Sequence, residues 1–272
     1  MSFAAPASAD HTPDFLTIQP YYYNNVGGYS PSWDPTFQPG DSKSKHTHKD
    51  QNEWLPIPWG YIGIFHAQTE ELLYAGTWGS DGVDPWDEFD LLEGEPYYVL
   101  FLFRDPTNRW SVSSGNEGAV YSTRSPIMTS LGGHVSQKVE WNAGVEISPD
   151  SEAALFATGM RAWPLLKHST ILAGWPTMLN VIPGFSPTAT YFALRQVRVH
   201  YGDTRTQDLT HELGHVAEYS IAAGKGAPIV PSMNYNYQGH SGHVWNSAEY
   251  KHVAYREALA DFVSLASIYP RS

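Results

Sequence analysis

Hydrophobic and polar positions alternate in short runs along the first half of the chain, and they recur at helical spacing in the second half. The early runs are rich in aromatic and β-branched residues and are bounded by Gly, Pro, Asp and Asn, which is typical of strands joined by turns. The expected strands cover residues 61–65, 72–75, 97–103 and 109–112. We therefore predict an antiparallel β-sandwich in the N-terminal half.

Residues 204–223 have the spacing of an amphipathic helix. The apolar positions that fall near one face are Leu209, Leu213, Val216, Ala217 and Ile221. Asp203 or Thr204 is suited to cap its N-terminus, and Gly224 ends it. Directly before it, residues 196–201 alternate in hydrophobicity, which predicts a strand with one solvent-exposed face.

Two further helices are expected on either side of this one. Residues 152–163 predict a capped helix that Pro164 interrupts. The second helix begins at about residue 249 or 253 and ends at residue 268, before Pro270. The boundary between the two halves of the chain is expected between Ser125 and Pro149.

Residues 211–215 read His-Glu-x-x-His within the predicted helix 204–223. Side chains four positions apart lie one turn apart on the same face, so His211 and His215 can bind one metal ion. Glu212 then lies beside the metal, where it can take a proton from a water whose pKa zinc lowers to about 7. The motif predicts a zinc hydrolase with Glu212 as its general base.

A catalytic zinc usually takes three protein ligands, so one more must come from outside this motif. The sequence directly after the motif lacks the Gly and the third His that metzincins place there. Glu257 is the main candidate, and Asp261, on the same helical face, would accept the second ring hydrogen of His211. The alternatives are His240 or His243 as the third ligand, with the two carboxylates on a solvated helix face.

With these two motifs the chain resembles the gluzincin metallopeptidases, of which thermolysin is the best known. The resemblance covers roughly residues 195–268, with His-Glu-x-x-His on one helix and Glu257-x-x-x-Asp261 on the next. A Gly-His-x-Trp stretch at residues 242–245 is also similar to a group of secreted zincin-like proteins. The resemblance implies a zincin-like mixed α/β catalytic domain, one Zn2+ and a protein or peptide substrate.

The linker between the two motifs is expected to supply the group that stabilises the oxyanion. A Tyr hydroxyl or an imidazolium aimed at the developing charge would lower the barrier. His243 is the first candidate. The alternatives are Tyr235, Tyr237, His240, Tyr250 and His252.

The amino-acid composition limits the functions that this chain can have. The 272 residues carry a formal net charge of −12, which disfavours nucleic-acid binding, and aromatic residues make up 14%. No apolar run approaches the roughly 20 residues of a membrane span. The chain has no Cys, so neither disulfides nor thiolate ligands can stabilise it. We expect a monomer.

Three other segments carry weaker signals. Residues 1–14 are expected to be disordered or processed, and Ala7-Ser8-Ala9 fits the small-x-small pattern of a cleaved secretory signal, so we predict a secreted protein. The acidic turn from Asp81 to Asp90 could bind calcium, although a solvated loop is favoured. His46 and His48 could also bind a metal, although their polar surroundings favour an exposed loop.

The sequence thus predicts an α+β protein with two parts. Residues 15–135 form a transthyretin-like or immunoglobulin-like β-sandwich, and residues 136–272 form the zincin-like catalytic domain. The predicted function is that of a zinc-dependent endopeptidase. The alternatives are a zinc hydrolase acting on glycoprotein or peptidoglycan peptides, recognised partly by aromatic surfaces, and a non-catalytic cell-surface binding protein.

Overall fold

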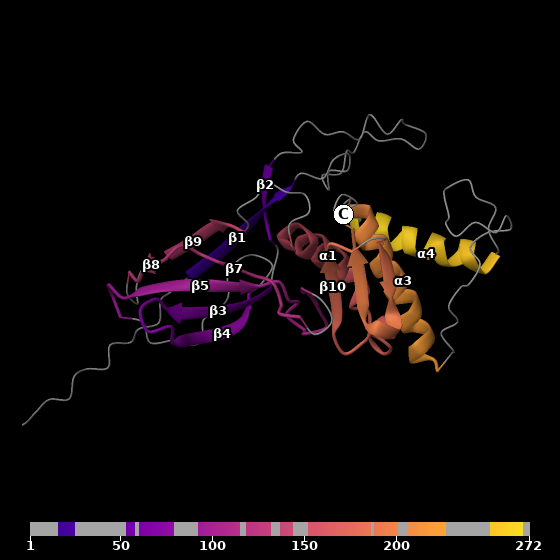
Figure 1. Ribbon diagram of the computed structural model, residues 1–272, viewed down its shortest axis with the longest axis horizontal. Helices are drawn as coiled ribbons and strands as arrows, with labels where there is room; N and C mark the ends of the chain where they lie inside the picture. The colour runs from indigo at the N-terminus through magenta and orange to yellow at the C-terminus, as the bar shows by residue number, and fades with distance from the viewer. Residues whose placement is uncertain are drawn as a thin grey trace, which may run out of the picture.

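The protein has a β-rich part and a helical part, which lie side by side along its longest axis (Figure 1). A computed structural model describes residues 16–24, 53–57, 60–78, 92–114, 118–131, 137–143, 152–185, 188–200, 206–226 and 251–268. Over these residues the chain is an α+β protein with three sheets and four α-helices. The predicted α+β class is therefore confirmed.

A five-stranded antiparallel sheet forms one layer of the β-rich part. Its strands run in the order β4 (Leu72–Trp78), β3 (Gly60–His66), β5 (Pro96–Leu102) and β7 (Ser122–Arg124), with β8 (Met128–Thr129) also paired to β5. Alternate side chains on its central strands, including Ile62, Ile64, Val99 and Phe101, are fully buried. The strands predicted at 61–65, 72–75 and 97–103 are thus present.

A smaller sheet joins segments from both ends of the β-rich part. Strand β1 (Leu16–Asn24) pairs antiparallel with β2 (Glu53–Pro56) and parallel with β9 (Gln137–Asn142). Ile18 and Val139 from this sheet share a hydrophobic core with Ile62 of the larger sheet. The Trp141 indole N–H donates to the Thr123 hydroxyl at 3.0 Å, which adds a polar contact between the two sheets.

The third sheet leads into the helical part. Its strands run in the order β11 (Ala189–Tyr191), β12 (Gln196–Val199), β10 (Leu179–Pro183) and β6 (Trp110–Val112). Only the β11–β12 pair is antiparallel. A 3-10 turn, η2 (Phe192–Leu194), connects β11 to β12. Val197 and Val199 are buried, as the alternation predicted, but Gln196 on the face expected to be solvent-exposed is also buried and Arg198 is half-buried.

Two of these pairings cross residue 135. Strand β6 was expected within the β-sandwich but pairs with β10, and β9 pairs with β1. Sequence periodicity reports which residues form a strand but not its partner, because pairing across a sheet depends on distant segments. The division of the chain at residue 135 stays a prediction.

Four helices complete the described chain: α1 (Glu152–Leu166), α2 (Ser169–Leu172), α3 (Thr206–Gly224) and α4 (Lys251–Ile268). The prediction that Pro164 interrupts the first helix was wrong, because α1 continues to Leu166. A proline in the last turn removes only one hydrogen bond, and burial of Trp163 and Leu166 in the core offsets that loss.

Helix α3 buries the predicted apolar face. Leu209, Leu213, Val216 and Ala217 are at most 2% exposed and share a core with Phe156 of α1. The opposite side of α3 faces α4, which lies beside it (Figure 1). The proposed caps Asp203 and Thr204, and Pro270 after α4, lie outside the described residues.

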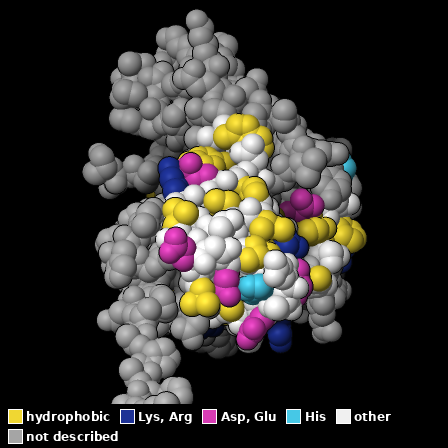
Figure 2. All heavy atoms as spheres, turned by 90° about the vertical axis from the view of Figure 1, so that its left-hand side faces the viewer, with side chains coloured by type: hydrophobic (Ala, Val, Ile, Leu, Met, Phe, Trp, Pro, Cys, Tyr) yellow, Lys and Arg dark blue, Asp and Glu magenta, His cyan; other side chains and the backbone are white. Residues whose placement is uncertain are grey.

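At the end of the molecule remote from α3 and α4, hydrophobic side chains are interspersed with acidic ones (Figure 2). Within the described ranges, no helix has both the length and the apolar character required to cross a membrane.

Candidate metal centre

Helix α3 presents two imidazoles on the side that faces α4. His211 and His215 are one turn apart, with ring centroids 4.8 Å apart and ring planes at 89°. Their side chains are 15% and 13% exposed, so both rings are largely withdrawn from water. This perpendicular arrangement allows one nitrogen of each ring to face a common point.

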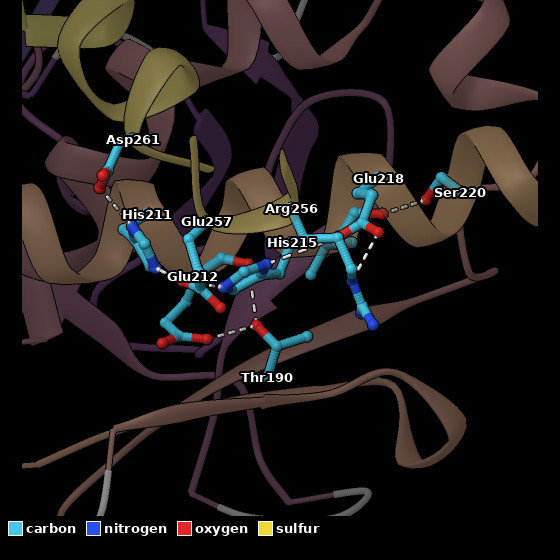
Figure 3. Close-up of polar contacts among 10 residues, drawn as sticks. Thr190, His211, Glu212, His215, Glu218, Ser220, Arg256, Glu257 and Asp261 are labelled. Atoms are coloured by element: carbon cyan, nitrogen blue, oxygen red, sulfur yellow. Dashed lines mark hydrogen bonds and ion pairs between the residues drawn. The ribbon is translucent and has the colours of Figure 1, made fainter. Parts of the chain in front are cut away.

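The carboxylate of Glu257 on α4 lies between these two rings (Figure 3). Its Oε2 atom is 3.1 Å from Nε2 of His211 and 3.3 Å from Nε2 of His215. The three potential ligand atoms lie within 4.8 Å of one another. This cluster could hold a metal ion.

Close packing of the helix backbones places Glu257 there. A Cβ on Gly214 would lie 2.6 Å from the Ala260 Cα atom, so only glycine permits this approach of α3 to α4. One turn away, the hydroxyls of Thr210 and Ser264 form a buried 2.8 Å hydrogen bond between the helices. Glu257 is one turn from Ala260 on the same face of α4, and therefore faces the histidines.

Asp261 contacts the other nitrogen of His211. Its Oδ1 atom lies 2.8 Å from Nδ1, whereas Nε2 faces Glu257. When Asp261 accepts the Nδ1 hydrogen, Nε2 keeps a free lone pair on the side of the cluster. The structure thus places Asp261 where it can orient the ring.

Glu212 lies beside the cluster and is held by the edge strand β11. The Thr190 hydroxyl donates to Glu212, with Oε2 at 2.7 Å and the Glu212 backbone carbonyl at 2.8 Å (Figure 3). Thr190 could not be identified from the sequence, because nothing in a three-residue edge strand marks one threonine as the partner of a glutamate 22 residues later.

The carboxylates change the acid–base behaviour of both rings. Burial by itself lowers the pKa of His211, but hydrogen bonds to Glu257 and Asp261 and the charge of Glu212 raise it above its ordinary 6.5. Burial also lowers the pKa of His215, but the nearby carboxylates of Glu218, Glu257 and Glu212 outweigh burial and raise that pKa to about 9. Both rings therefore lie in a strongly negative environment that favours a cation.

Two more residues of this environment were not found from the sequence. The Arg256 Nε atom is 2.6 Å from Oε1 of Glu218, and Oε2 of Glu218 is 3.7 Å from Nδ1 of His215. Two signals were available, since Glu218 follows His215 by one helical turn and Arg256 directly precedes Glu257.

Several candidates lie where the structure gives no account of their side chains. These are His243 and its alternatives Tyr235, Tyr237, His240, Tyr250 and His252, the acidic turn from Asp81 to Asp90, His46, His48 and the segment 1–14. Their assigned roles stay predictions.

Comparisons of this chain with known protein families, with curated proteins and with solved structures found no match. The geometry and chemistry of the centre must therefore carry the assignment of function.

The donor atoms are of the kinds that a metal ion such as zinc binds. Two imidazole nitrogens and a carboxylate oxygen form a common ligand set of catalytic zinc, at about 2.0–2.2 Å from the metal. Two ligands at that distance in tetrahedral geometry lie about 3.3–3.5 Å apart. The distances of 3.1 and 3.3 Å from Glu257 to the two rings are close to this value.

Proposed function

We propose that this protein is a zinc-dependent endopeptidase in which His211, His215 and Glu257 bind one Zn2+. The observation that carries the proposal is the convergence of two ring nitrogens and one carboxylate oxygen beside a second carboxylate, that of Glu212. A bound zinc would supply Lewis acidity to polarise a water molecule and the carbonyl group under attack.

The residues of the chain have separate parts in this chemistry. Glu212 takes a proton from the attacking water and later passes it to the nitrogen of the leaving amine. Its charge acts on both rings, and the Thr190 hydroxyl holds its carboxylate. Asp261 accepts the Nδ1 hydrogen of His211, so that Nε2 is free to bind the metal.

We extend the proposal to the fold and to the family. A β-sandwich would precede a zincin-like catalytic domain of the gluzincin type. The proposal is supported by β12, which directly precedes the helix that carries both histidines, and by α4, which brings Glu257 to them. Secretion and a monomeric state stay predictions from the sequence.

The test is digestion of a broad peptide library by the zinc-loaded protein, with mass spectrometry of the products. We expect cleavage that a chelator abolishes and zinc restores. Glu212→Gln should lower turnover by on the order of 10²–10⁴ while one zinc per chain stays bound. Full activity of this variant would refute Glu212 as the base.

A matched control is Glu140→Gln. Glu140 is a half-exposed carboxylate on β9 that contacts Lys138 and Tyr21 and takes no part in the cluster. This variant should cleave and bind zinc like the wild type. An equal loss of activity in both variants would indicate a general effect of removing a charge.

A further inference from the structure

We infer that Glu218 is the positioning residue for His215, and that Arg256 acts by holding Glu218 in place. The inference rests on the proposed metal site and deepens it. Glu218 would do for His215 what Asp261 does for His211: accept the hydrogen on Nδ1 and so leave Nε2 free for the metal.

The geometry of His215 carries the first step. Its Nε2 atom faces Glu257 at 3.3 Å, so the opposite nitrogen, Nδ1, points away from the cluster and toward Glu218 Oε2 at 3.7 Å. Both of these facing atoms are buried, and among the described residues neither has a hydrogen-bond partner. A buried N–H and a buried carboxylate oxygen are costly when left unpaired. A movement of about 0.8 Å would join them at ordinary hydrogen-bond length.

Arg256 explains why Glu218 is held at this place. Its guanidinium contacts Oε1 of Glu218 and lies 4.7 Å over the ring of Tyr219, and its side chain is only 13% exposed. Oε1 is therefore engaged by arginine, and Oε2 is left to face the imidazole. Figure 3 shows Glu218 between Arg256 and His215, on the side of the ring away from Glu257.

The position of Glu218 also argues against its being a fourth metal ligand. It faces the nitrogen that is remote from the cluster, and the group of ligand atoms within 4.8 Å of one another does not include it. A carboxylate at that nitrogen fixes the tautomer and the orientation of a metal-binding ring and makes it a stronger donor. Adjacent residues of α4 thus act on both sides of His215, Glu257 directly and Arg256 through Glu218.

The experiment measures zinc affinity by competition with a chromogenic chelator. Glu218→Gln is expected to weaken zinc binding by about 10–100-fold, in the same range as Asp261→Ala, while Glu140→Gln binds like the wild type. Proton NMR of the zinc-loaded protein should show the Nδ1 hydrogen of His215 far downfield in the wild type, and this signal should move upfield and exchange faster with water in Glu218→Gln, because a neutral amide is a weaker acceptor than a carboxylate. A merely structural role of Glu218 would leave this signal unchanged.

Arg256→Met tests the second step. We expect it to weaken zinc binding in the wild type and to have no further effect in the Glu218→Gln background, because it acts through Glu218. Additive effects would overturn the role of Arg256. Should Glu218→Gln not fold, Glu218→Asp keeps the charge but withdraws it from the ring, and must weaken zinc binding in the same direction.

The outcomes separate this inference from the proposed function. A wild-type protein that binds no zinc overturns the metal site and this inference together. A wild type that binds zinc, with a folded Glu218→Gln variant that binds it equally well, overturns this inference alone.

Discussion

Two carboxylates of this protein are withdrawn from water in different regions and have different surroundings. Asp105, in the turn before β6, is fully buried and accepts hydrogen bonds from the backbone N–H groups of Thr107, Arg109 and Trp110 and from the Thr107 hydroxyl. Glu257 on α4 is 12% exposed and presents one oxygen to two imidazoles.

The difference shows how the chain separates structure from chemistry. Backbone N–H groups are donors whose positions the fold fixes. The Asp105 carboxylate therefore has permanent hydrogen-bond partners, and its role is to stabilise the turn. Ring nitrogens can each bind a proton or a metal ion, so the charge of Glu257 is available to an exchangeable cation. A buried carboxylate therefore indicates a binding site only where the groups that contact it can exchange a proton for a metal ion.

Replacing Glu257 should have the largest effect on binding. Glu257→Gln removes a ligand charge, and we expect zinc affinity to fall by more than about 100-fold, beyond the loss typical of a residue that only orients a ligand. Isothermal titration with zinc measures this. An unchanged affinity would mean that the third ligand lies elsewhere, with His240 and His243 as the alternatives.

Replacing Asp105 should lower the stability of the fold and leave zinc binding unchanged. Asp105→Ala leaves the N–H groups of Thr107, Arg109 and the buried Trp110 without their acceptor, and we expect the free energy of unfolding to fall by about 3 kcal/mol. Urea denaturation of the metal-free protein measures this. Zinc affinity of the folded variant should match the wild type, so a large loss of zinc binding would contradict the separation of the two regions.

The third prediction uses pH to separate the regions. The pKa of His215 in the metal-free protein is about 9, above its ordinary 6.5, so folding takes up a proton between these values. That stabilisation is complete below pH 6.5 and is lost as the pH rises through 9, so the melting temperature of the metal-free protein should fall over this window. Zinc must displace the same proton, so zinc affinity should rise by about tenfold per pH unit.

Asp105→Ala is the control for this pH dependence, because Asp105 takes no part in the cluster. The variant should melt at a lower temperature than the wild type at every pH. Its melting temperature should change with pH by the same amount as that of the wild type. His215→Asn should remove the dependence assigned to His215. If the melting temperature of His215→Asn depends on pH as that of the wild type does, the proton taken up on folding belongs to another group.

The smallest effect is expected at Thr190. Thr190→Val removes the hydroxyl that donates to Glu212 and keeps a similar volume, so we expect turnover to fall by about 2–10-fold, as for one lost hydrogen bond. Zinc affinity should not change, because Thr190 does not contact the ligands. A fall in zinc affinity without a fall in turnover would show that Thr190 does not act by holding Glu212.

Much of the secondary structure followed from local periodicity. The predicted strands at 61–65, 72–75, 97–103 and 109–112 and the helix at 204–223 all correspond to observed elements. Their partners did not follow, as β6 illustrates by joining β10 of a later segment. Side-chain spacing reports which face of an element is buried, but the same apolar face can pack against any suitable neighbour.

The sequence by itself determined the relation of His211 to His215, because one turn of α-helix places residues four apart on the same face wherever the helix lies. Only the tertiary structure decided which carboxylates meet these rings. Glu257 comes from 46 residues away, and it reaches His211 because Gly214 lets the backbone of α4 approach α3 closely. Thr190 and Arg256 likewise come from other elements, and such contacts depend on how helices and strands pack rather than on local spacing.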